Sequence, residues 1–185
     1  MYITKNEKEF SDEYLNQGYI IRPAADLEAL EWMSKQFIYL ISSELEIDAE
    51  SDPQDILNHI HNKVSISELN AFRLKIIQGI NGIEGFREMY FRVARPYLEA
   101  LVGNELAMQL RVNLSIQFPG DSSSLLPVHA DTWSGDSPFE AVVWVPLVDC
   151  YKTKAMYILP PIPANELNQQ FVERAGNNSD DLYNS

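Results

Sequence analysis

Hydrophobic residues recur every three or four positions through the first hundred residues, which is the spacing of helices with one buried face. Asp26 is a good N-cap for the first long helix, and Asp52-Pro53 begins a second helix that we expect to reach about Val64. Ser65 and Glu68 form a capping box for a third helix, and Gly103 ends the last. The apolar stripe of the first long helix consists of Leu27, Leu30, Met33, Phe37, Ile41 and Leu45. Residues 1–103 are therefore predicted to be mainly helical.

After Gly103 the hydrophobic period changes from 3.6 to 2, which is typical of strands. Between Met108 and Phe118 apolar and polar residues alternate, so one face is expected to be buried. Further strands are predicted at 125–132, at 139–147, which is nearly all apolar, and at 155–159. The fold class predicted is α+β: a helical half followed by a β core over residues 104–162 that forms a partial jelly roll. A small open sheet with one face on helices is the alternative.

Length and composition predict one domain over residues 1–175, followed by a loose polar tail at 176–185. The formal net charge of -13 argues against a nucleic-acid or anionic-membrane surface, but it does not identify a substrate. A single cysteine, Cys150, fits a reducing compartment, and the first residues lack the plan of a signal peptide. We therefore expect a cytoplasmic protein without a transmembrane helix, and the oligomeric state stays open.

The candidate chemistry lies at His129 and Asp131. Residues two positions apart on a strand point to the same face, so an imidazole and a carboxylate would converge there. Two such ligands and a second histidine make the facial triad that binds Fe(II) and leaves positions open for a co-substrate and O2. The competing interpretation of this short motif is a surface strand whose histidine and aspartate face water.

In its context the motif resembles a known family. The chain from about Arg111 to Pro161 resembles the metal-binding half of 2-oxoglutarate/Fe(II)-dependent dioxygenases of the phytanoyl-CoA-hydroxylase-like type, some of which belong to carbohydrate biosynthesis. The segments that carry the resemblance are 128–131, the apolar strand with Trp144, and 157–161. The family has a double-stranded β-helix fold, so the resemblance implies that fold for the β core. It also implies Fe(II) and 2-oxoglutarate as cofactors, and a small-molecule substrate such as a sugar or sugar-nucleotide.

The resemblance implies a role for individual residues as well. His129 and Asp131 would ligate the iron as the catalytic pair, and Trp144 would lie beside 2-oxoglutarate. Asn113 and Gln117, on the polar face of the first β-core strand, would face the co-substrate. Lys154 is a further candidate for contacting 2-oxoglutarate, with a solvated turn lysine as the alternative.

The chain departs from the family's pattern after Asp131. No histidine follows it, and the only later arginine is Arg174, whereas the family has a distal histidine and then a cation for the 2-oxoglutarate carboxylate. One explanation is a C-terminally truncated chain, and a second is a protein that has lost its metal. In a third, water, a carboxylate such as Asp149 or Glu173, or a partner chain completes the site.

Two other functions stay open beside the oxygenase. One is a non-catalytic jelly-roll module that binds a carbohydrate or a partner. The other is a cupin-like isomerase or epimerase with His129 as its base. The remaining histidines, His59 and His61, fall in a predicted helix, where residues two apart point to nearly opposite sides. The sequence therefore predicts that they do not share a metal ion.

Overall fold

The computed structural model describes residues 4–47, 52–122 and 129–172. Across these ranges the chain forms six α-helices and three short 3₁₀ turns, and none of these residues belongs to a β-strand. The α-helices are α1 (Lys5–Gln17), α2 (Leu27–Glu44), α3 (Pro53–Asn58), α4 (Ile66–Asn81), α5 (Phe86–Val102) and α6 (Pro161–Val172). The 3₁₀ turns are η1 (Ile60–Asn62), η2 (Asp131–Ser134) and η3 (Lys152–Lys154). The described fold is all-α, so the predicted α+β class is wrong.

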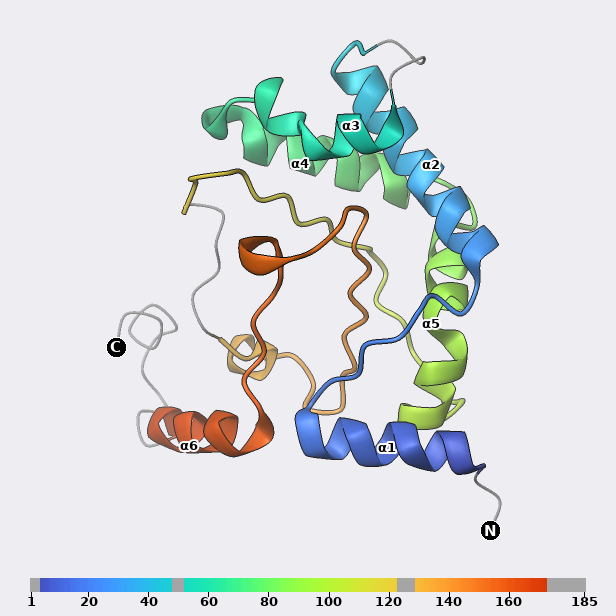
Figure 1. Ribbon diagram of the computed structural model, residues 1–185, viewed down its shortest axis with the longest axis vertical. Helices are drawn as coiled ribbons and strands as arrows, with labels where there is room; N and C mark the ends of the chain where they lie inside the picture. Colours follow the sequence, from blue (N-terminus) through green and yellow to red (C-terminus); the bar gives the residue numbers. More distant parts are fainter. Residues whose placement is uncertain (1–3, 48–51, 123–128, 173–185) are drawn as a thin grey trace.

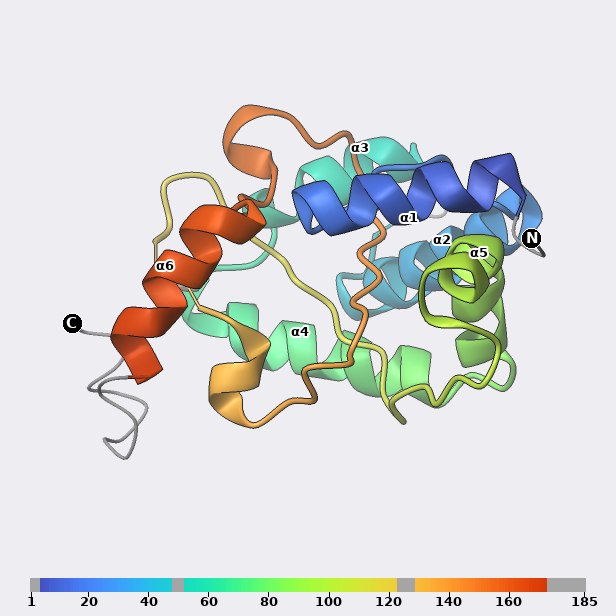
Figure 2. The same cartoon turned by 90° about the horizontal axis from the view of Figure 1, so that it is seen from below.

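The helices form a frame around the extended segments (Figure 1). Helix α2 packs against α5, α4 and α3, and α1 packs against the other end of α5. Figure 2 shows the same frame from below, with the extended segments running between the helices and α6 at the edge of the molecule. No helix in the described ranges is long and apolar enough to cross a membrane.

The helix boundaries follow the capping residues that the sequence predicts. The Asp26 carboxylate accepts a hydrogen bond from the Ala29 amide at 2.9 Å and begins α2. The Glu68 carboxylate accepts from the Ser65 hydroxyl at 2.5 Å and from its amide at 3.3 Å, which is the reciprocal half of a capping box. Helix α5 ends before Gly103, whose φ of 90° is a left-handed value that favours glycine.

The hydrophobic core lies between α2, α4 and α5. Phe86 is 1% exposed and its ring meets Phe37 edge-on, with 5.6 Å between the ring centroids. The core also extends under the first extended segment, where Val112 and Phe118 are buried. The buried hydrophobic residues are Ala29, Met33, Phe37, Ile41, Ile56, Ile60, Val64, Leu69, Phe72, Ile76, Ile80, Phe86, Val93, Val112 and Phe118.

The segment between α5 and residue 122 crosses the molecule as extended coil (Figure 1). The predicted alternation is present in its burial, because Val112 and Phe118 are buried while Asn113 and Gln117 are exposed. Residues 139–147, predicted as a nearly all-apolar strand, belong to a second extended segment that reaches residue 150. Its burial also alternates, since Val142 is 65% exposed while its two neighbours are partly buried. The period of 2 thus indicates which side chains are buried, but neither segment pairs with a neighbouring strand among the described residues.

Side chains of the helices take the place of that neighbouring strand. Asn81 at the end of α4 bonds both backbone groups of Val112: its Oδ1 accepts from the amide at 2.8 Å, and its Nδ2 donates to the carbonyl at 2.9 Å. Arg87 of α5 donates to the carbonyl oxygens of Met108 and Gln109. In the second extended segment, the Tyr90 hydroxyl of α5 donates to a backbone carbonyl. The backbone is therefore held without a β-ladder, which is the physical reason that the jelly-roll, or double-stranded β-helix, prediction fails.

The other predicted strands fail for local reasons. Residues 125–128 lie outside the described ranges, and His129 and Ala130 lead directly into η2. Residues 155–160 are coil that ends at α6, with Pro161 as the first helical residue. The β core predicted for 104–162 is therefore wrong, and the predicted tail at 176–185 lies outside the described residues.

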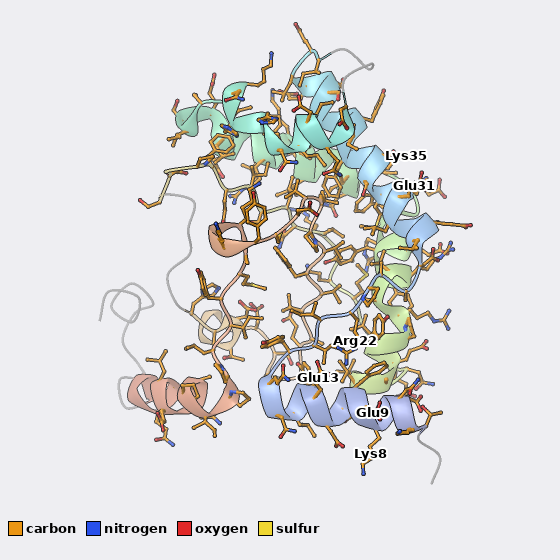
Figure 3. All side chains as sticks on the ribbon, in the orientation of Figure 1. Lys8, Glu9, Glu13, Arg22, Glu31 and Lys35 are labelled. Carbon is orange, nitrogen blue, oxygen red and sulfur yellow. The ribbon has the colours of Figure 1, made fainter. Side chains whose placement is uncertain are left out.

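Residues 18–22 follow α1 as coil that is held by an ion pair. Two guanidinium nitrogens of Arg22 donate to the two carboxylate oxygens of Glu13, at 2.5 and 3.1 Å (Figure 3). This hydrogen bonding lowers the pKa of Glu13. The same guanidinium lies 4.9 Å from the centroid of the Phe10 ring. The pair fixes the chain reversal after α1, where a left-handed Gly18 ends the helix.

Candidate functional site

His129 and Asp131 lie at the entrance to a short turn and not on a strand. Ala130 between them is extended, with φ -121° and ψ 138°, and Asp131 is the first residue of η2. The turn closes at Gly135, whose φ of 98° is left-handed and whose amide donates to the Thr132 carbonyl at 3.3 Å. One extended residue followed by a tight turn thus presents the two side chains.

The two side chains converge. His129 Nε2 lies 3.6 Å from Asp131 Oδ1, with the side chains 30% and 54% exposed. In an octahedral site with metal–ligand bonds of about 2.1 Å, neighbouring ligand atoms lie about 3.0 Å apart, so the observed spacing is about 0.6 Å wide. A small side-chain rotation would close that gap. The pair thus offers one nitrogen and one oxygen donor to a cation, or a simple ion pair when the imidazole is protonated.

A third ligand does not join this pair within the described residues. Among them, no three histidine, cysteine, aspartate or glutamate side chains are grouped so that they could hold a metal ion. Asp149, which the sequence left open as a further ligand, is a described residue and therefore does not complete the site. His59 and His61 do not complete it either. Glu173 and Arg174 lie outside the described residues.

The other predicted site residues are found on the two extended segments. Asn113 and Gln117 are exposed on the first segment, and Trp144 is 46% exposed on the second. In both Figure 1 and Figure 2 the first segment lies apart from η2, where Asp131 is. The structure therefore brings His129 and Asp131 together but does not place Asn113 and Gln117 beside them.

The single cysteine shows no sign of being a nucleophile. Partial burial raises the pKa of the Cys150 thiol, and the nearby Asp149 raises it further, while Lys154 acts in the opposite direction. The thiolate, which is the reactive form, is thus disfavoured. Cys150 therefore packs as a small, partly buried residue.

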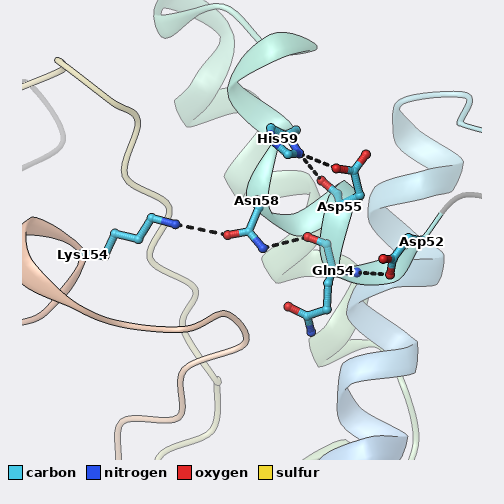
Figure 4. Close-up of polar contacts among 6 residues, drawn as sticks. All are labelled: Asp52, Gln54, Asp55, Asn58, His59 and Lys154. Atoms are coloured by element: carbon cyan, nitrogen blue, oxygen red, sulfur yellow. Dashed lines mark hydrogen bonds and ion pairs between the residues drawn. The ribbon is translucent and has the colours of Figure 1, made fainter.

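A second group of polar side chains, which the sequence analysis did not identify as a site, lies in a groove beside α3 (Figure 4). The groove has a volume of about 460 Å³ and is lined by Asp52, Gln54, Asp55, Asn58, His59, His61, Pro119 and Lys154. Lys154 reaches across it from η3 and donates to Asn58 Oδ1 at 3.2 Å. The available sequence signal was the spacing His59-x-His61, which was set aside because a continuous helix was expected. Helix α3 in fact ends at Asn58.

We compared the chain with protein-family models, with curated proteins and with solved structures, and none of the three comparisons found a match. Function is therefore inferred from the side chains of His129 and Asp131 and from the groove beside α3.

Proposed function

We propose that His129 and Asp131 are two ligands of a divalent metal centre, and that the protein is a 2-oxoglutarate/Fe(II)-dependent oxygenase acting on a small molecule. The observation that supports this most directly is the 3.6 Å separation of His129 Nε2 and Asp131 Oδ1. The proposal depends on this donor pair and on the sequence resemblance around it.

The donor set suits a metal of this type. A neutral imidazole and one carboxylate are ligands that Fe(II) accepts, and the single carboxylate charge offsets part of the charge of the ion. Iron and 2-oxoglutarate, when bound, would supply the oxidising chemistry. The chain's own part is to hold His129 and Asp131 on one side of η2, with enough exposure for small molecules to approach.

The proposal requires a third ligand from outside the described residues, and it requires a cation for the 2-oxoglutarate carboxylate. Lys154 is a poor choice for that cation, because its ammonium group donates to Asn58 and lies 5.3 Å from the centroid of the Tyr151 ring. We therefore assign metal ligation to His129 and Asp131 and leave the carboxylate anchor unassigned.

Anaerobic titration of the full chain with Fe(II) and 2-oxoglutarate tests the proposal. A chelated complex should give an absorption band in the visible range, and that band should be lost in His129→Ala and Asp131→Ala. The matched control is His59→Asn, another histidine substitution at an exposed position, which should leave the band unchanged. A wild-type protein without the band, or a band that survives both substitutions, would refute the assignment.

One observation favours the non-catalytic alternative. Asp131 is more than half exposed, and a third ligand does not join the pair among the residues that the structure describes. A surface ion pair of this kind contributes little to stability. If the titration gives no complex, we favour a binding module in which His129 and Asp131 form only a surface pair.

A further inference from the structure

His59 and His61 lie next to each other because the helix before them ends early. Helix α3 stops at Asn58, and His59 has φ -120° and ψ 19°, outside the helical range. The chain then turns into η1, so the two imidazole rings come within 5.9 Å, measured between their centroids. On a continuous helix these rings would point to nearly opposite sides.

The ring of His59 is oriented by Asp55. Its Nδ1 lies 3.0 Å from the backbone carbonyl oxygen of Asp55 and 2.7 Å from the Oδ1 of the same residue (Figure 4). A carbonyl oxygen only accepts hydrogen bonds, so Nδ1 carries the proton. In the neutral ring Nε2 then keeps its lone pair. A carboxylate or carbonyl that fixes the tautomer in this way is the usual neighbour of a metal-binding histidine.

The position of His61 is set by an aromatic contact with the core. Its ring contacts that of Phe118 edge-on, with 6.3 Å between the centroids, and Phe118 is buried in the core at the end of the first extended segment. Two imidazoles bound to one tetrahedral ion through bonds of about 2.0–2.1 Å have centroids about 5.2 Å apart. The spacing of 5.9 Å between His59 and His61 is about 0.7 Å wider, a gap that small rotations of the two rings would close.

The charges around the groove favour a cation. Asp52 and Asp55 supply two carboxylates, against one ammonium from Lys154. Lys154 donates to Asn58 on the opposite wall, and this bond holds the ammonium at a defined point. The volume of about 460 Å³ leaves room for an ion with several water ligands.

We propose that His59 and His61 bind a divalent transition-metal ion of the zinc type through their ring nitrogens, with water completing the coordination. Imidazole is a preferred ligand for zinc, nickel and copper, whereas calcium and magnesium prefer oxygen. Asp55 is a positioning residue that acts through His59. This site is separate from His129 and Asp131 and does not depend on the oxygenase proposal.

Isothermal titration of the full chain with zinc chloride tests the site. The wild-type protein should bind one ion in the groove, and His59→Asn/His61→Asn should lower the affinity at least tenfold. Asp55→Ala should weaken binding by about tenfold, as is typical for a partner that orients a ligand. Nuclear magnetic resonance of ¹⁵N-labelled histidine should show that zinc shifts the Nε2 signal of His59 and leaves its Nδ1 protonated.

The matched control is Asn62→Ala, a change at an exposed residue of η1 that does not line the groove, which should leave this zinc affinity unchanged. Far-UV circular dichroism of each variant confirms that its helices are intact. Wild-type protein that does not bind zinc, or zinc affinity that is unchanged in His59→Asn/His61→Asn, overturns the proposal. Loss of binding in His129→Asn alone would also overturn it, because it would place the ion at the other site.

Discussion

Substituting Asn81 by alanine should destabilise the protein through the extended segment rather than through α4 itself. The amide side chain of Asn81 bonds both backbone groups of Val112 and also donates to the Ile77 carbonyl at 2.7 Å. Val112 is only 4% exposed, so water cannot easily replace these partners. Asn81→Ala would leave an amide and a carbonyl unsatisfied at the edge of the core.

The expected loss can be estimated from the two bonds to Val112. Each intramolecular hydrogen bond contributes about 0.5–1.5 kcal/mol net, so the free energy of unfolding should fall by about 2 kcal/mol. For a chain of this length that corresponds to a melting temperature lower by about 4–8 °C. Alanine is the better helix former, which reduces the loss by a few tenths of a kcal/mol.

Urea denaturation followed by circular dichroism measures this free energy. The matched control is Asn70→Ala, the same change on the exposed face of α4, where Asn70 accepts one bond from Arg73. The control should stay within about 0.5 kcal/mol of the wild type, because it removes a surface contact and gains the same helix propensity. Equal unfolding free energies for the two variants would refute the idea that Asn81 anchors the segment.

Three further substitutions, in the core and at its edges, should change the free energy of unfolding or its dependence on pH. Phe86→Ala removes a ring that is 1% exposed and should lower the free energy of unfolding by about 3–5 kcal/mol, measured in urea. Burial raises the pKa of Tyr90, so the unfolded chain ionises first and the free energy of unfolding should fall as the pH rises above about 10. Tyr90→Phe lacks the ionisable hydroxyl and its bond to Val143, so this variant should not show that fall. The bonds from the Ala29 amide and from Arg92 lower the pKa of Asp26, so stability should fall as pH drops below about 4, and less so in Asp26→Asn; equal acid profiles would contradict this.

The helices could be predicted because their signals are local. Asp26, the Ser65–Glu68 pair and Gly103 each act within one turn of the chain, and the structure ends or begins a helix at each. The end of α3 was predicted about six residues too late. There the apolar residues Ile60 and Val64 continue the helical spacing, although the backbone has already left the helix at His59.

The sequence could not show that the extended segments lack a β-sheet neighbour among the described residues, because strand pairing depends on distant parts of the chain. The alternation at Val112 and Phe118 correctly indicated a half-buried extended segment, and sequence alone does not show which groups satisfy its backbone. In the structure a side chain from α4 does so at Val112. The same limit applies to function: the pairing of His129 with Asp131 is visible in the sequence, whereas the groove around His59 depends on where one helix ends.

Anchoring through the backbone has a consequence for how this protein tolerates change. Asn81 and Arg87 form hydrogen bonds with backbone groups that every residue type except proline provides, so the outward-facing side chains of the first extended segment contribute little to holding it in place. Arg111, Asn113, Ser115 and Gln117 all face outward there. These four positions should therefore accept many substitutions without loss of the fold. A position among them that does not tolerate substitution in a saturation scan would mark a residue that contacts a ligand or a partner.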